Sequence, residues 1–194
     1  RPFSNGITNQ IWGSYEKSFS DKVTIELGLS SFFRLSDDTD FYLQQFYAQS
    51  SLYFLRLKAG RKVEAPDVPN PELSVGSFGI NSQTTPLPEV KIEVPDFTPV
   101  PFTSDILWFK GQLSHTWLEE DRFVKNAYLH EKDFYLSLYK EGIPVRASAG
   151  LNHFAQWQGR HPDVGSLGGS LEDYFRVLLG KGAEASEIKG EISN

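Results

Sequence analysis

The fold of this chain is decided by a stretch that alternates between two classes of side chain: Val145-Arg146-Ala147-Ser148-Ala149-Gly150-Leu151-Asn152-His153-Phe154-Ala155-Gln156-Trp157. Alternation with a period of two predicts a β-strand. The strand breaks in a bend rich in glycine and proline at residues 159–165, and a short helix is predicted over residues 170–179. Ser170 suits the N-cap, Asp173 can meet free backbone N–H groups, and Gly180 can end the helix. We therefore predict a loop over residues 158–182 that carries its own helix.

The N-terminal part of the chain repeats this alternation over two long strands, residues 7–19 and 22–35. In the second, Val23, Ile25, Leu27 and Leu29 alternate with polar residues and glycine. Each strand would have about 13 residues, against a usual length of about 5–6 in globular proteins. Residues 20–21 form a tight turn, so the pair is a predicted hairpin with one apolar and one polar face.

Further strands are predicted along the rest of the chain. A second hairpin spans residues 41–48 and 52–61 around a turn at residues 49–51, and residues 75–80 are a candidate for an additional short strand. Alternation continues over residues 89–94, 105–117 and 132–139. Residues 165–169, rich in glycine, do not follow a strand in the way a phosphate-binding loop requires, so we interpret them as a flexible joint.

The connections between these strands alternate in length. Tight turns at residues 20–21, 49–51 and 141–144 alternate with longer segments at residues 36–40, 63–88, 118–131 and from 158 onward, and residues 96–103 are of moderate length. Consecutive antiparallel strands put every second connection at the same end, so the long loops would share one rim. This pattern is typical of an outer-membrane barrel. The alternative is a soluble β-sandwich, whose strands also alternate but are usually shorter.

We therefore predict an all-β fold, an antiparallel up-and-down transmembrane β-barrel with a short helix in an extracellular loop, residues 158–182. Residues 183–194 are mostly polar, and nothing in the sequence marks pairing of the last strand with the first. Residues 1–194 are thus expected to be a single segment of a larger barrel.

Composition excludes several classes of function. The net charge of -6 argues against a nucleic-acid partner, which usually requires a basic face. The absence of cysteine removes disulfides, thiolate metal sites and cysteine nucleophiles. No run approaches the roughly 20 apolar residues that a membrane-spanning helix needs.

Several passages resemble the capsule assembly outer-membrane family (Wzi-like) in its Bacteroidetes-type form. The resemblance rests on residues 117–126, 129–132, 150–157, 171–178 and 180–182, with a weaker match at residues 43–48. It implies a barrel of about eighteen strands, larger than this chain can supply. It also implies location in the outer membrane of a Gram-negative bacterium and a lectin-like, non-catalytic role that holds capsular polysaccharide.

Candidate polysaccharide-binding residues lie near the predicted rim of long loops. Flat aromatic rings suit the apolar faces of sugars, and amide or charged groups suit their hydroxyls. The candidates are Trp117, Glu119, Asp121, Arg122, His130, Asn152, Trp157, Arg160 and His161. Two kinds of candidate also have a structural interpretation, because tryptophans such as Trp117 and Trp157 gather at membrane interfaces and the charged run at residues 119–122 is a natural solvated loop. We interpret His153, which shares a strand face with Leu151 and Ala155, as structural.

No catalytic residue, metal site or cofactor is predicted. Adjacent acidic residues at 119–121 do not define the two-carboxylate geometry of a glycosidase, and no Gly-x-Ser-x-Gly motif occurs. The four histidines have no compact metal-binding spacing. The alternative functions are a pore whose lumen is lined by polar residues such as Lys22, Glu26 and Arg34, and a soluble carbohydrate-binding or hydrolysing β domain.

The expected partners are surface polysaccharide and outer-membrane lipid, with no nucleic acid and with a monomer as the simplest oligomeric state. The helix at residues 170–179 is interpreted as a structural lid, which either packs into the barrel mouth through Leu171, Phe175 and Leu178 or caps the rim.

Overall fold

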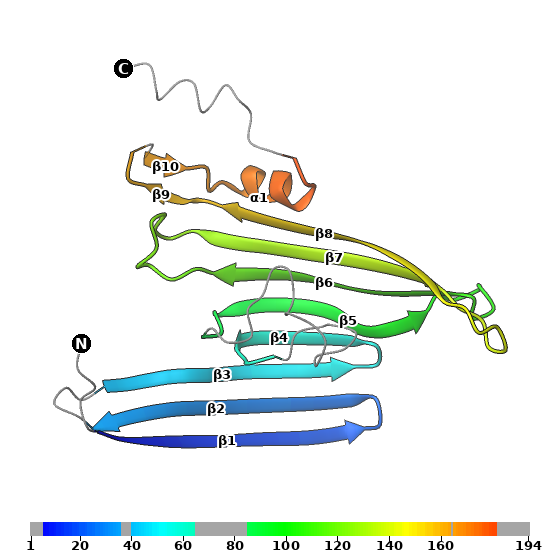
Figure 1. Ribbon diagram of the computed structural model, residues 1–194, viewed down its shortest axis with the longest axis horizontal. Coiled ribbons are helices and arrows are strands. Elements are labelled where there is room, and N and C mark those ends of the chain that lie inside the picture. The colour runs from blue at the N-terminus through cyan, green and yellow to red at the C-terminus, as the bar shows by residue number, and fades with distance from the viewer. Residues whose placement is uncertain (1–5, 36–39, 65–84, 164, 182–194) are drawn as a thin grey trace, which may run out of the picture. The chain divides into compact units, whose positions relative to one another are not determined.

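A computed structural model describes residues 6–35, 40–64, 85–163 and 165–181 of the chain (Figure 1). The described residues form an all-β protein with one short helix. The chain divides into two compact units, Arg1–Pro88 and Glu89–Asn194. Within the described residues, no helix is long and apolar enough to cross a membrane.

The first unit is an antiparallel sheet of four strands in chain order: β1 (Ile7–Ser20), β2 (Val23–Leu35), β3 (Asp40–Leu52) and β4 (Leu55–Arg61). The first predicted hairpin is confirmed, with strands of 14 and 13 residues, although its turn is at residues 21–22 rather than at the predicted 20–21. Its ladder runs from Ile7 opposite Leu35 to Ser20 opposite Val23. The candidate strand at residues 75–80 lies outside the described residues.

The predicted turn of the second hairpin was wrong. Gln49, Ser50 and Ser51 continue β3 and pair with β4, and the chain reverses at Tyr53 and Phe54. Tyr53 adopts a positive φ of 56° there. The error has a physical cause, because polar residues resemble a turn in sequence whereas here they occupy ladder positions. The true turn carries aromatic residues, which give no turn signal.

The second unit is also an antiparallel sheet in chain order: β5 (Glu89–Pro99), β6 (Leu107–Trp117), β7 (Tyr128–Leu138) and β8 (Ala147–Trp157). β5 continues beyond the predicted end at Val94. Its register shifts between Val94 and Thr98, and pairing with β6 resumes at Thr98. Such an irregularity accommodates Pro95, which cannot donate a ladder hydrogen bond. β7 begins at Tyr128 rather than at the predicted Lys132, so the loop before it is shorter than predicted.

A small two-stranded sheet and a helix follow β8. β9 (Gly159–His161) pairs with β10 (Gly165–Leu167), so the interpretation of residues 165–169 as a flexible joint was wrong for the first three of them. The predicted helix is confirmed as α1 (Leu171–Leu178), with Ser170 as its N-cap. Asp173 N–H donates to Ser170 Oγ, and Asp173 Oδ2 accepts from Ser170 N–H at 2.8 Å. This reciprocal pair is a capping box.

Both units expose apolar side chains on one sheet face. On the apolar face of the first unit, Ile11 and Leu29 are 68% and 53% exposed, and on that of the second Leu151 is 79% exposed. Several residues of the opposite, polar faces are buried: Ser30, Lys58, Lys91, Ser114, Thr116, Glu131 and Ser137. Ala127 is the one hydrophobic residue that is buried in the part of the chain that the structure describes. Both sheets are therefore inverted relative to a soluble domain, which buries its apolar residues.

Each polar face contains a tyrosine ring that lies over a glycine directly across the ladder. Tyr47 covers Gly28 and Tyr135 covers Gly150, so closely that an added Cβ at either glycine would overlap the ring. A glycine in a strand leaves backbone uncovered, and a cross-strand aromatic ring restores that packing. The ladders of the described residues join β1 only to β2 and β8 only to β7, and none of them closes a barrel.

Candidate functional site

An aromatic–histidine cluster lies at one end of the second unit, on its apolar face. Strand register creates it, because Trp117, Tyr128 and Trp157 occupy successive partner positions on β6, β7 and β8. His130 lies opposite His115 on β6 in the same way. The cluster is defined by seven residues: His115, Trp117, Tyr128, His130, His153, Trp157 and Tyr174.

Ring-to-ring contacts hold the cluster together. The His115 ring centroid lies 4.8 Å from that of Trp117 and 4.9 Å from that of Tyr128. Tyr128 and Trp157 are 5.3 Å apart at an interplanar angle of 62°. Tilted and edge-to-face pairs at such separations are favourable because the ring edge is positive and the face negative.

Helix α1 contributes Tyr174 to the cluster. The Tyr174 ring lies 5.5 Å from that of Trp157 and 6.1 Å from those of His115 and His130. Lys132 Nζ also donates a hydrogen bond to the backbone carbonyl of Leu178. α1 is thus held over the apolar face of the sheet.

The predicted packing of the helix was wrong in two of its three residues. Leu171 and Phe175 are exposed, and only Leu178 is half-buried. The sheet contact is made by Tyr174, which the helical spacing also allowed. A helix of this length presents apolar residues over a wide arc, and the sequence alone does not say which part of that arc meets the sheet.

Several ring nitrogens of the cluster lack hydrogen-bond partners within the described residues. His130 is 0% exposed, and within the described residues neither of its ring nitrogens has a partner. The same holds for Nδ1 of His115 and of His153 and for Nε1 of Trp157. Buried polar groups are usually paired, so these rings are held by packing and lose their hydration without compensation. The described residues contain no group of three or more acidic or histidine side chains able to hold a metal ion.

The loops beside the cluster bring together most of the charged candidates. Glu119, Asp121 and Arg122 are exposed in the connection from β6 to β7. That loop is joined to β9 by backbone hydrogen bonds between Lys125 and Arg160, of 2.8 and 3.2 Å. We call residues 118–127 and 158–163 the rim loops.

The rim loops also contain an aromatic contact. The Phe123 ring lies 4.9 Å from the His161 ring, and His161 Nδ1 accepts a hydrogen bond from the backbone N–H of Asp163. Gly159 lies where the loops meet, with a φ of 109° and with Lys125 O only 2.8 Å from the position a Cβ would take. Only glycine suits this combination of conformation and close approach.

Asn152 is separated from the other candidates. It lies on the polar face of β8, opposite Asp133, whereas Trp157 lies on the apolar face. Its Oδ1 accepts a hydrogen bond of 2.8 Å from Tyr135 OH. Since that tyrosine also covers Gly150, Asn152 has a structural role in the sheet.

The structure thus sorts the predicted residues into three places. Trp117, His130 and Trp157 belong to the cluster, and Glu119, Asp121, Arg122, Arg160 and His161 belong to the rim loops. Sequence reasoning missed His115, Tyr128 and Tyr174 as cluster members. Tyr128 and His115 could be found only from the ladder register, which the late predicted start of β7 hid.

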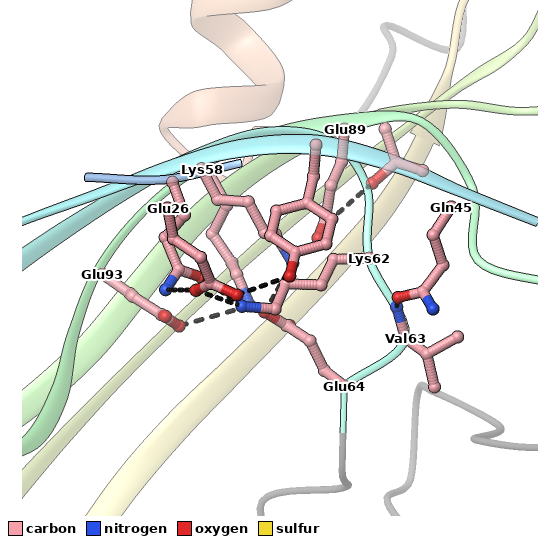
Figure 2. A network of polar contacts seen from close by, with 12 residues as sticks. Glu26, Gln45, Lys58, Lys62, Val63, Glu64, Glu89 and Glu93 are labelled. Atoms are coloured by element: carbon pink, nitrogen blue, oxygen red, sulfur yellow. Dashed lines mark hydrogen bonds and ion pairs between the residues drawn. The ribbon is translucent and has the colours of Figure 1, made fainter. Parts of the chain in front are cut away.

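The polar face of the first unit carries a second site, the Glu26 network (Figure 2). The Glu26 carboxylate accepts hydrogen bonds from Tyr47 OH at 2.5 Å, Lys62 Nζ at 2.9 Å and Gln49 Nε2 at 3.0 Å. Lys62 also lies 4.5 Å from the centroid of the Tyr47 ring. Nearby, Lys58 pairs with Glu64 at 2.7 Å. Four charged groups of this region, Glu26, Lys62, Lys58 and Glu64, are therefore closely paired.

No family model matches the chain, and no curated protein or solved structure matches it either. The function is therefore inferred from the two sheet faces, the aromatic–histidine cluster and the rim loops.

Proposed function

We propose that this chain forms part of the wall of an outer-membrane β-barrel that holds exported polysaccharide at the cell surface without catalysis. The observation that carries the proposal is the inverted polarity of both sheets. Exposed apolar residues such as Ile11, Leu29 and Leu151 would gain about 1.5–3 kcal/mol each on removal from water. Lipid on that side, with the polar face turned to the lumen, gives each face a suitable solvent.

The lengths of the strands support the same conclusion. A strand needs about 9–11 residues to cross the hydrocarbon layer of a membrane when it is tilted. All strands of the two meanders reach this length except β4, which has 7 residues. The backbone of each inner strand is paired on both sides within its sheet, as a hydrocarbon environment requires.

The cluster and the rim loops match the two zones expected at the outer end of such a wall, an aromatic girdle at the membrane interface and polar loops beyond it. Trp117, Tyr128 and Trp157 lie at strand ends on the apolar face, where an aromatic girdle would contact the membrane interface. The rim loops beyond them offer Glu119, Asp121, Arg122, Arg160 and His161, whose groups can hydrogen-bond to sugar hydroxyls. The resemblance to the Wzi-like capsule assembly family supports polysaccharide as the ligand.

A pore is the second candidate function, and the charged polar face favours it. Lys62 and Glu26, Lys58 and Glu64, and Lys91 and Glu93 are ion pairs on the polar faces. Charged groups on a lumen wall can select ions. Because these charges are paired, we expect little conductance. A stable open channel in planar bilayers would favour the pore instead.

The membrane part of the proposal is tested by fractionation of cells that produce the native gene product. We expect it in the outer-membrane fraction, with a gel mobility that changes on heating. Recovery without detergent and without a heat-dependent shift would contradict the barrel and support the soluble carbohydrate-binding β domain.

The polysaccharide part is tested with the double variant Arg122→Ala, Arg160→Ala in a deletion strain. Both side chains are exposed on the rim loops, so we expect less cell-bound polysaccharide with unchanged protein level. Lys140→Ala is the matched control, because Lys140 is an exposed cation in the connection at the opposite end of β7 and β8. Equal polysaccharide retention by the double variant and wild type would contradict the assignment of the rim loops.

A further inference from the structure

Helix α1 has more apolar surface than the sheet covers. Tyr174 faces the cluster and Leu178 is half-buried, whereas Leu171, Phe175 and Leu179 at the C-cap are 80%, 57% and 68% exposed. These three residues are four positions apart, so they form one continuous stripe along the helix. A contiguous exposed apolar stripe marks a site of contact with a protein or a membrane.

The position of the helix indicates what that partner is. Among the described residues, the sheet side chains in ring contact or hydrogen bonding with α1 belong to the apolar face of the second unit: His115, His130, Lys132 and Trp157. The helix therefore lies on the face that carries exposed Leu151. Whatever solvates that face also reaches the stripe.

The polar residues of α1 complete the argument. Asp173 forms the capping box, and Glu172 and Arg176 lie on the side of the helix away from Tyr174. A helix with one apolar side, one charged side and a position beside an aromatic girdle has the composition of an interfacial helix. Such a helix lies along the membrane surface with its apolar side among the acyl chains.

We infer that α1 is an interfacial helix that inserts Leu171, Phe175 and Leu179 among lipid acyl chains at the level of the aromatic girdle. The inference rests on the proposed function, because it needs lipid on the apolar face of the sheet. It assigns a role to the helix that a lid over the lumen does not have, because the helix lies on the opposite side of the sheet from the polar face. The occupant is lipid rather than a protein surface because the helix lies on the same face of the sheet as exposed Leu151, which the proposed function turns to lipid.

The absence of cysteine makes a direct test possible. The native protein, reconstituted in phosphatidylcholine vesicles, is labelled with a fluorophore at single cysteines introduced as Leu171→Cys, Phe175→Cys and Glu172→Cys. Leu151→Cys on β8 reports on the sheet face itself. Each label is exposed to a brominated acyl chain as the lipid quencher and to iodide as the aqueous quencher.

We expect the lipid quencher to remove most of the fluorescence at positions 171, 175 and 151, and iodide to remove it at position 172. Lipid quenching at 151 with iodide quenching at 171 and 175 would overturn the interfacial helix and leave the barrel intact. Iodide quenching at 151 as well would overturn the barrel together with the helix. Labels at 171 and 175 shielded from both quenchers would overturn the lipid assignment in favour of a protein contact.

Discussion

The Glu26 network and the aromatic–histidine cluster differ in how their polar side chains are held: by hydrogen bonds in the first and by ring packing in the second. In the first unit, Glu26 accepts hydrogen bonds from three different side chains on the polar face. In the second unit, His130 is fully buried on the apolar face with no hydrogen-bond partner for either ring nitrogen among the described residues. Polar side chains thus occur at both sites. In the Glu26 network their atoms are hydrogen-bonded, whereas the ring nitrogens of His130 are not.

This difference separates hydrogen bonding from ring packing as the source of stability. Removal of one member of a satisfied network leaves its partners unpaired, which costs more than the bond itself contributed. Replacement of an unpaired buried polar group by an apolar group of similar shape removes a desolvation cost. Substitutions of similar size should therefore have opposite signs in the two sites.

The largest effect is expected for Glu26→Ala. The substitution leaves Lys62 and Tyr47 without their acceptor, and we expect a loss of about 2–3 kcal/mol in the free energy of unfolding. Urea unfolding of the protein in lipid vesicles measures it. Glu26→Gln keeps two of the hydrogen bonds and should lose less. Equal losses for the two variants would show that the hydrogen bonds are not the source of the effect.

The next effect is expected at the glycine beneath Tyr47. Gly28→Ala forces the ring aside and draws its hydroxyl away from Glu26, with an expected loss of about 1–2 kcal/mol by the same unfolding assay. Gly13→Ala on β1 is the matched control, because nothing lies within 4 Å of its added Cβ. The control should be neutral or stabilising by up to about 1 kcal/mol. Equal changes in the free energy of unfolding for the two alanine variants would show that the Tyr47 ring does not depend on Gly28.

The aromatic–histidine cluster should respond in the other direction. His130→Phe keeps a flat ring against Tyr174 and removes two unpaired nitrogens, so the free energy of unfolding should stay unchanged or rise by up to about 2 kcal/mol. Polysaccharide retention should also be unchanged, since a residue with 0% exposure cannot touch a ligand at the surface. A variant that unfolds more easily, or loses retention, would assign His130 a polar role that ring packing does not explain.

The smallest effect is local and depends on pH. The hydrogen bonds from the Ser170 side chain and backbone hold the pKa of the Asp173 carboxyl below its ordinary value. A lowered folded pKa means that the capping box is fully formed above the unfolded value of about 4 and is lost as the pH falls below it. Protease cleavage within residues 165–181 should increase over that range. Asp173→Asn should remove the pH dependence, whereas persistence of the same profile would exclude Asp173 as its source.

The alternation of side chains in the sequence was enough to predict most strands, because a period of two is a local property. The capping box of α1 was predictable for the same reason, since Ser170 and Asp173 are three residues apart. The turn at Tyr53 and Phe54 was not, because its residues give no local signal and the ladder overrides the polar appearance of residues 49–51.

The candidate site was less predictable than the fold, because it depends on register. Asn152 and Trp157 are close in sequence but lie on opposite faces of β8, and only the pairing of Asn152 with Asp133 and of Trp157 with Tyr128 shows this. Likewise, the apolar residues of α1 were recognised, yet the sequence could not say that Tyr174 rather than Phe175 meets the sheet. Contacts between elements depend on strand register and helix orientation, and neither leaves a local pattern in the sequence.

Lipid on the apolar face of the sheets is tested most directly by comparing the solvent around the two faces of a single strand. Single cysteines at Ile11, Tyr15, Ser14 and Glu16 of β1 are labelled in the native protein reconstituted in vesicles with brominated lipid. We expect the lipid to quench labels at Ile11 and Tyr15, whereas labels at Ser14 and Glu16 should escape it. Quenching without this alternation, or at Ser14 and Glu16 instead, would contradict an inverted sheet in a membrane.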